Sequence, residues 1–545
     1  MGGAHVQRLE TTLDRVSERP PSPHGEPVGQ PAGQPTGQAG TGPTAAGGLA
    51  QIETSARSQS IWMTLARSIA AVLTMAIPIV LVRVLDQTTF GHYKQLFLVS
   101  STAIPLLSLG LPGSLYYFVP REPERSQRFH GQTLLMLSLM GLVGGTVLVL
   151  ARDPLSGFFD APLQSYVGWI ALYTAFAVPA SLLVTCPMVD RRARLAALLL
   201  TAFDVTRSGA LIAVALVSGK LTAILIAACG IMVLQTVGAI VYLMWRGQGR
   251  SSAPTRSNLR DQLAYALPFT GAALIGLVQM KIHAYYVAAT FSAAQFAVYA
   301  IATLEIPLIG QFSRTVGEVV ILETTREHSK RNLDEVRRLW YRATHILALV
   351  LFPLFMMGEF FASDLIRLMF GDSYADAAPI FRVYLLIIPL SIFLGSAMLR
   401  ATRDLGVMVA ADTISLLATI GVLVLLAGPW GVLGAVTSLV VGRATFMTVA
   451  SRRTARRLEL RVRDFLPWRR ISVLMGLSAV AAGSAFLTVD QFEFPLLVRL
   501  LIGGMLATSI YATVTWHAGL VAEEEKQLVR AKIAGLTHRI GRGAR

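Results

Sequence analysis

Long apolar runs, separated by short polar segments, dominate the chain from Ile61 onward. A run of about 20 apolar residues is long enough for a helix to cross the hydrocarbon core of a bilayer. By this criterion the sequence predicts fourteen transmembrane spans, at about 61–82, 96–119, 132–151, 166–187, 196–217, 221–245, 266–288, 296–322, 343–362, 379–399, 406–427, 431–450, 471–489 and 495–517. Prolines inside several spans predict kinks, because neighbouring helices in a membrane bundle can satisfy the backbone groups that proline leaves free.

The composition supports a membrane protein and excludes other classes. Of 545 residues, 53% are hydrophobic and only 15% are charged, against about 25% charged in an ordinary soluble domain. These values exclude a soluble enzyme, a disordered chain and a disulfide-stabilised scaffold. The long apolar runs also exclude an outer-membrane barrel, whose strands alternate polar and apolar residues. We therefore expect an all-α integral membrane protein.

The formal net charge is +16, but the distribution of the charges argues against nucleic-acid binding. Arginine and lysine gather in every second loop, for example around Arg191, Arg326 and Arg456, while the alternate loops carry few of them. Loops rich in basic residues stay in the cytoplasm. We expect a multi-pass protein of the cell (inner) membrane with both termini in the cytoplasm, and no nucleic-acid partner.

The spans and their flanks predict five segments. Residues 1–55 are rich in Pro, Gly, Gln, Ser and Thr and should form a disordered cytoplasmic tail. Spans 1–6 form an N-terminal lobe over 56–245, spans 7–12 form a C-terminal lobe over 246–450, and two extra spans follow within 451–517. Residues 518–545 form a basic amphipathic cytoplasmic tail that is suited to anionic membrane lipids.

An enzyme is the weaker functional class. Every predicted external loop is short, whereas a membrane glycosyltransferase or polymerase needs a sizeable loop or domain for its chemistry. Gly219-Lys220-Leu221-Thr222 lacks the glycine spacing of a phosphate-binding loop, and the histidines show no metal-ligand spacing. We expect no catalytic residues, no metal and no cofactor.

A weak internal repeat indicates a carrier. Phe90-Gly91-His92-Tyr93 follows the first span, and Phe296-Ala297-Val298-Tyr299 follows the seventh at a constant offset of 206 residues. The two places correspond if the lobes are parallel repeats of six spans. Carriers built from such repeats bind their substrate at the interface between the repeats and expose it to each side in turn.

Three motifs carry a resemblance to a known family. Arg83-Val84-Leu85 with Phe90-Gly91-His92-Tyr93 is similar to an R-x-L … [FY]-G-x-Y element, and Phe296-Ala297-Val298-Tyr299-Ala300 to a G-x-Y-A element. The segment Leu365–Tyr374 resembles an L-I-x-L-x-F-G-x-x-Y loop between spans 9 and 10. In these motifs, over about 61–450, the chain resembles the polysaccharide flippases of the multidrug/oligosaccharidyl-lipid/polysaccharide exporter superfamily.

The resemblance implies a flippase that exports a polyprenyl-diphosphate-linked oligosaccharide from the inner to the outer leaflet. The product would be a surface polysaccharide, such as lipopolysaccharide or exopolysaccharide. Candidate partners are the lipid-linked oligosaccharide, membrane lipids, and the polysaccharide polymerase and export machinery. Members often carry an Asp beside the cation of span 7, whereas this chain has Met280-Lys281. The missing acid argues against ion coupling at that position.

Charged residues inside the predicted spans form the candidate site. A cation there costs roughly 2.5–3.5 kcal/mol or more on insertion scales, so a function is the first hypothesis. Cations suit a diphosphate head group, and we predict substrate binding by Arg67, Arg207, Lys281 and Arg314. Candidate groups for ion coupling are His283, Glu305, Glu318 and Asp412.

Structural pairing is the alternative role for two of these cations. Asp204 lies three residues before Arg207, and Glu318 lies four residues after Arg314. Residues at these spacings share one helix face and can neutralise each other.

Three other functions stay open from the sequence. A multidrug exporter of the same superfamily would favour an acidic cavity for organic cations, whereas the conspicuous buried charges here are basic. A flippase of peptidoglycan precursors would share both the fold and the anionic head group. A membrane enzyme of polysaccharide synthesis is disfavoured by the short loops.

Overall fold

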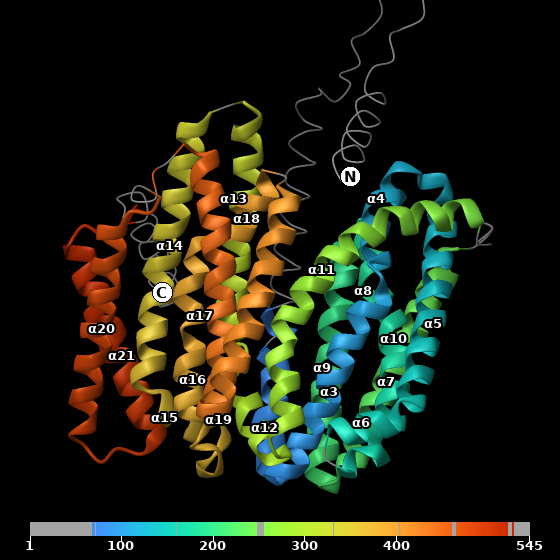
Figure 1. The fold of residues 1–545 in the computed structure, drawn as a ribbon, viewed down its shortest axis with the longest axis horizontal. Helices are drawn as coiled ribbons and strands as arrows, with labels where there is room; N and C mark the ends of the chain where they lie inside the picture. Colours follow the sequence, from blue (N-terminus) through green and yellow to red (C-terminus); the bar gives the residue numbers. More distant parts are fainter. Residues whose placement is uncertain are drawn as a thin grey trace, which may run out of the picture. The chain divides into compact units, whose positions relative to one another are not determined.

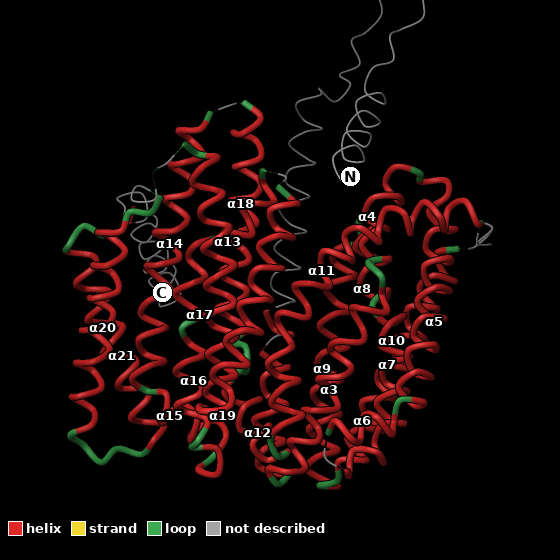
Figure 2. Tube along the Cα trace, in the orientation of Figure 1, coloured by secondary structure: helices red, strands yellow, loops and turns green. Residues whose placement is uncertain are grey.

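The computed structural model describes residues 68–247, 255–521 and 526–527, except positions 71, 160, 331, 403, 460 and 462–464. These residues belong to one compact unit, residues 57–545. They form α-helices and short 3-10 turns, with no strand among them, so the predicted all-α class is confirmed (Figures 1 and 2). The predicted tail at 1–55, Arg67 and the last eighteen residues of the chain, 528–545, lie outside the described residues.

The described helices make the chain a multi-pass membrane protein. Ten of them are long and apolar enough to cross a membrane, or eleven if one strongly bent helix counts as a single span. This number is lower than the fourteen spans expected from the sequence. Three features account for the difference: a shorter apolar helix at Ser68–Val84, a break in the predicted span 296–322, and a hairpin within Gly406–Arg457 that counts as one helix.

The break in the predicted span 296–322 corrects the sequence analysis. Helix α12 covers Ala293–Ala302 and α13 covers Pro307–Ser329, with four non-helical or turn residues between them. Pro307 is the first residue of α13. Proline has no backbone N–H and is favoured at the start of a helix, so it begins α13 and cannot continue α12.

The long helix α19, Leu405–Arg457, reverses its direction at Gly431. This glycine has φ 55° and ψ −130°, a conformation that residues with a side chain rarely adopt. A Cβ on Gly434 would lie 2.2 Å from the carbonyl oxygen of Leu426, and Ser415 Oγ donates a 2.6 Å hydrogen bond to the Gly442 carbonyl. Since these contacts pair positions progressively farther from the bend, α19 is an antiparallel hairpin that contains both predicted spans 406–427 and 431–450.

The first bundle of helices follows the short helix at Ser68–Val84. In it α5 packs on α7, α7 on α10 and α10 on α9, and α4 packs on α5. Its helices are α3 (Gln87–Ser108), α4 (Leu111–Arg121), α5 (Ser126–Leu150), α6 (Arg152–Phe158), α7 (Val167–Ala180), α8 (Leu182–Val189), α9 (Ala193–Ser218) and α10 (Leu221–Arg246).

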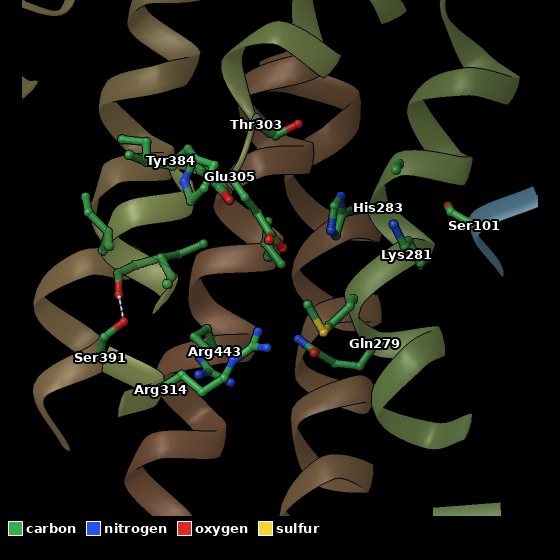
Figure 3. Close-up of a pocket in the computed structure, with 18 of the residues that line it drawn as sticks. Ser101, Gln279, Lys281, His283, Thr303, Glu305, Arg314, Tyr384, Ser391 and Arg443 are labelled. Carbon is green, nitrogen blue, oxygen red and sulfur yellow. Dashed lines mark hydrogen bonds between the residues drawn. The ribbon is translucent and has the colours of Figure 1, made fainter. Parts of the chain in front are cut away.

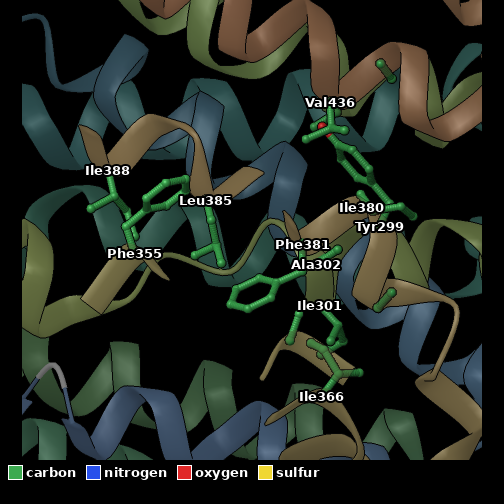
Figure 4. Packing of buried hydrophobic residues seen from close by; sticks show 14 of the residues in the cluster. Tyr299, Ile301, Ala302, Phe355, Ile366, Ile380, Phe381, Leu385, Ile388 and Val436 are labelled. Carbon is green, nitrogen blue, oxygen red and sulfur yellow. The ribbon is translucent and has the colours of Figure 1, made fainter. Parts of the chain in front are cut away.

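The second bundle holds α13 against α14 and α18, and α18 against the α19 hairpin. The last two helices form a pair that packs on α14 at the edge of this bundle (Figure 1). Figure 4 shows part of the buried apolar cluster, in which Phe355 of α14 and Leu385 of α16 lie in the core. The helices are α14 (Leu333–Phe360), α15 (Ala362–Phe370), α16 (Ala377–Leu385), α17 (Ile387–Leu390), α18 (Gly395–Ala401), α20 (Trp468–Asp490) and α21 (Leu496–His517).

Helix α11, Arg256–Thr290, connects the two bundles and is bent by 52° between Pro268 and Ala273. Its first part is fixed to the first bundle, because the buried Gln262 side chain accepts a 2.8 Å hydrogen bond from Gln132 and donates one of 3.2 Å to Ser114. Its second part packs along α19 of the second bundle. One helix therefore belongs to both lobes, with the bend between the two contacts.

The internal repeat marks two helix starts that lie against each other. Asp86 caps α3 by accepting a 3.0 Å hydrogen bond from Thr89 N, and Ser292 caps α12 by accepting one of 3.3 Å from Gln295 N. Both caps and both partners follow the same offset of 206 residues. Helices α3 and α12 pack closely, so equivalent elements of the two halves meet at the interface between the lobes.

Each lobe also fixes a carboxylate that follows its fourth span. Asp190, after α8, pairs with Arg246 at 2.5 Å at the end of α10. Asp404, after α18, pairs with Arg453 at 3.2 Å and Arg457 at 2.8 Å at the end of α19. The hydrogen bonds from Arg457 and Arg453 lower the pKa of Asp404 to about 2, so this carboxylate is charged at any physiological pH.

Gly91 makes the closest contact between α3 and α12, and its replacement tests the packing of the lobes. A Cβ there would lie 1.9 Å from the backbone oxygen of Ala293. Because a backbone atom cannot move aside as a flexible side chain can, Gly91→Ala should lower the free energy of unfolding by about 1–3 kcal/mol. Thermal unfolding in detergent measures the effect. Gly209→Ala is the control, since nothing lies within 4 Å of its added Cβ, and equal stability of the two variants would contradict this packing.

Candidate transport cavity

A cavity of about 1560 Å³ lies between the two lobes. The first lobe contributes residues of the helix at Ser68–Val84 and of α3, and the second contributes residues of α12, α13, α16, α18 and α19. The bent helix α11 supplies much of the wall. Typical pockets for drug-sized ligands measure about 300–1,000 Å³, so this cavity has room for a larger molecule.

The charges that line the cavity are mostly positive. Five lining residues are basic and two are acidic: Lys94, Lys281, Arg314, Arg400 and Arg443 against Glu305 and Asp412. Cations inside a membrane protein are expensive unless they face water, a partner or a ligand. The excess of positive charge therefore suits an anionic ligand.

The structure brings together most of the residues singled out in the sequence. Lys281 and Arg314, predicted to bind substrate, both line the cavity, as do His283, Glu305 and Asp412. Glu318 lies exposed on α13 and is not among the lining residues. Arg67 lies outside the described part of the chain.

Arg207 differs from the other cations, because its partners are inside the first lobe. Its guanidinium forms a 3.0 Å ion pair with Asp204 and donates a 2.8 Å hydrogen bond to Thr74. Thr74 lines the cavity, whereas Arg207 and Asp204 do not. The structure favours the pairing role for Arg207. The other expected pair, Arg314 with Glu318, forms no ion pair although both residues are described.

Three cations of the cavity were missed in the sequence. Arg443 stands inside the predicted span 431–450, so a complete survey of charges within spans identifies it. Lys94 and Arg400 lie just outside the predicted spans 96–119 and 379–399, in segments assigned to loops. Both are helical in the structure, in α3 and α18, because helices continue beyond their apolar cores.

Polar side chains of α11 face the cavity opposite the arginines. Figure 3 shows Gln279, Lys281 and His283 on this helix, across from Arg314 and Arg443. His283 is buried, and its Nδ1 is hydrogen-bonded to the hydroxyl of Tyr299. Its Nε2 has no hydrogen-bond partner among the described residues. This nitrogen is buried against protein atoms.

The lobes are joined near the cavity by two of the sequence motifs, Arg83–Tyr93 and Leu365–Tyr374. Arg83 donates a 2.8 Å hydrogen bond to the Leu368 carbonyl, and the Gln87 amide donates to the Ser373 carbonyl. The rings of Phe90 and Tyr374 meet edge to face, with centroids 6.2 Å apart. Gln87 and the cavity residue Lys94 lie on the same helix, about 10 Å apart along its axis. These contacts join the two lobes near Lys94.

The fold is that of lipid and multidrug transporters. A solved structure described as lipid II flippase MurJ in an inward closed conformation matches with a TM-score of 0.65 at 13% identity, covering 85% of this chain and 100% of that chain. A multidrug resistance MATE family transporter of the MOP superfamily, in its inward-facing conformation, matches with a TM-score of 0.58 at 15% identity, covering 73% and 98%. A MOP superfamily transporter from Pyrococcus furiosus has a TM-score of 0.54 at 15% identity, covering 73% and 94%.

The sequence adds a family match to this shared fold. The family model described as polysaccharide biosynthesis protein matches residues 57–309. This stretch contains two of the three motifs on which the resemblance to polysaccharide flippases depends, at Arg83–Tyr93 and Phe296–Ala300. The predicted resemblance is thus confirmed. No curated protein matches the chain in sequence.

Proposed function

We propose that this protein is a flippase that moves a polyprenyl-diphosphate-linked oligosaccharide across the membrane during the assembly of a surface polysaccharide. The observation that carries this proposal is the cavity between the lobes, with five basic lining residues against two acidic ones. A diphosphate bridging a lipid and a sugar carries about two negative charges, one on each phosphate. Arginine binds phosphate oxygens in pairs, and lysine adds a point charge.

The remaining lining residues suit a saccharide. Gln279, Thr303, Tyr384 and Ser391 offer hydrogen-bonding groups around the cavity (Figure 3). Sugar hydroxyls need such partners, because a buried hydroxyl without a hydrogen bond is costly. The volume of about 1560 Å³ also admits more than a single small molecule.

Other functions fit the cavity less well. A multidrug exporter of organic cations would place acidic groups where this cavity has five basic ones. A flippase of peptidoglycan precursors remains the second candidate, because the structure described as a lipid II flippase shares the fold. The match to a polysaccharide biosynthesis family over residues 57–309 favours the oligosaccharide. We propose no catalytic activity for this chain.

The proposal extends to topology and partners. The basic residues of alternate loops support a protein of the inner membrane with both termini in the cytoplasm. The flipped oligosaccharide would then pass to a polymerase and to export machinery on the outer side. His283, Glu305 and Asp412 line the cavity and stay candidates for ion coupling, together with Glu318.

Removal of the arginines tests recognition of the head group. Arg443→Gln and Arg314→Gln should each weaken the binding of a polyprenyl diphosphate at least tenfold, about 1.4 kcal/mol, because each loses a charged partner of the phosphates. Binding to purified protein in nanodiscs measures the affinity. Arg152→Gln is the control, since Arg152 is exposed at the start of α6. Folded variants with unchanged affinity would contradict the assignment.

Locking the contact between Gln87 and Ser373 tests alternating access. In a Gln87→Cys/Ser373→Cys variant, a short, reducible bifunctional thiol reagent should join the lobes, because these residues are in contact. Flipping should stop after cross-linking and recover after reduction. Cys186 and Cys229 are buried and should not interfere, and the treated Gln87→Cys variant is the control. Full flipping by the cross-linked protein would exclude opening at this contact.

A further inference from the structure

The basic residues of the cavity fall into two groups. The first group, the arginine site, consists of Arg314 on α13, Arg400 on α18 and Arg443 on α19, with the carboxylate of Asp412. Figure 3 labels Arg314 and Arg443 among the residues that line the cavity. All four residues belong to the second lobe.

The second group, the lysine site, consists of Lys94 on α3 and Lys281 on α11, with Glu305 nearby. All three residues line the cavity, and Figure 3 labels Lys281 and Glu305 among them. Neither lysine forms an ion pair with any described residue. Figure 3 shows Lys281 across the cavity from Arg314 and Arg443. The lysine site is therefore separate from the arginine site and extends to the first lobe through Lys94.

Together the two sites carry more positive charge than one diphosphate can balance. In the arginine site, three guanidinium groups and one carboxylate leave a net charge of +2, which balances the roughly two negative charges of a diphosphate diester. In the lysine site, two ammonium groups and Glu305 leave a net charge of +1. A neutral sugar would leave this charge uncompensated inside the membrane, which is unfavourable.

We infer that the saccharide itself is acidic: the arginine site holds the diphosphate, and the lysine site binds a carboxylate on a sugar, as in a uronic acid. This inference rests on the proposed function and names the class of its substrate. A sugar carboxylate in the cavity would compensate the charge of these lysines and accept charge-assisted hydrogen bonds from their ammonium groups.

The surroundings of the lysine site support a sugar carboxylate. His283 lies two residues after Lys281, lines the cavity and is buried, and its Nε2 has no hydrogen-bond partner among the described residues. Thr303 and Tyr384 also line the cavity and supply hydroxyl groups (Figure 3). The lysines therefore recognise the acid, while neighbouring polar groups recognise the ring to which it is attached.

The test compares three ligands on purified full-length protein in nanodiscs: polyprenyl diphosphate alone, the same lipid carrying glucose, and the same lipid carrying glucuronic acid. The wild-type protein should bind the glucuronic acid compound about tenfold more tightly than the glucose compound. Lys281→Gln and Lys94→Gln should each abolish most of this preference. Arg443→Gln should weaken the binding of all three ligands by a similar factor. Lys220→Gln is the control, because Lys220 is an exposed residue before α10.

The outcomes separate this inference from the proposed function. If the wild-type protein binds all three ligands but does not distinguish glucuronic acid from glucose, the inference is wrong and the proposed function stands. The inference is also wrong if both lysine variants keep the full preference. If polyprenyl diphosphate and its two glycosides all fail to bind the wild-type protein, the proposed function is wrong and the inference falls with it.

Discussion

The cost of placing charge inside a membrane is the constraint on which this structure depends. Arg443 and Lys281 stand on helices that are apolar and long enough to cross a membrane, and such cations need water, a partner or an anionic ligand. Arg207 is stabilised by a carboxylate on its own helix. The basic residues of the cavity have only Glu305 and Asp412 among the lining acids. In the proposed function, the anionic head group of the substrate balances this excess positive charge.

The arrangement of the lobes places this charge where a carrier needs it. The starts of α3 and α12 occupy equivalent places in the two halves and pack against each other through Gly91 and Ala293. Such an interface between parallel repeats is where alternating-access carriers bind their substrate. Helix α11 is fixed to one lobe by Gln262 and packs on the other beyond its bend. A change in the bend angle of α11 would therefore move the second lobe, together with Lys281, relative to the first lobe.

Much of the fold could be predicted because apolar runs of membrane length leave helices as the main option. Hydropathy could not show where a run is broken, and it therefore missed the separation of α12 from α13, although Pro307 was the signal. The hairpin at Gly431 was predicted correctly as two spans, since the run 406–450 is too long for one. Asp86 and Ser292 cap equivalent helices in the two halves. This equivalence became visible only in the structure, because an aspartate and a serine do not align as identical residues.

The candidate site was predicted in part for a related reason. Lys281, Arg314 and Asp412 were found because each interrupts an apolar run. The sequence analysis missed Lys94 and Arg400 because they lie beyond the apolar cores of their helices. Arg207 was selected by the same rule as Lys281, and only the three-dimensional structure distinguishes its ion pair from a cation facing the cavity. Sequence position shows that a charge is inside the membrane, but the partner of that charge depends on tertiary structure.

The most direct test of the central claim is the movement of a lipid-linked saccharide between leaflets. Purified protein would be reconstituted into liposomes that carry a fluorescent polyprenyl-diphosphate oligosaccharide, and a membrane-impermeant quencher would report the fraction in the outer leaflet over time. We predict that the protein speeds the exchange of this lipid between leaflets well above the rate in protein-free liposomes. The account is contradicted if exchange is as slow as in protein-free liposomes while the same protein transports an organic cation.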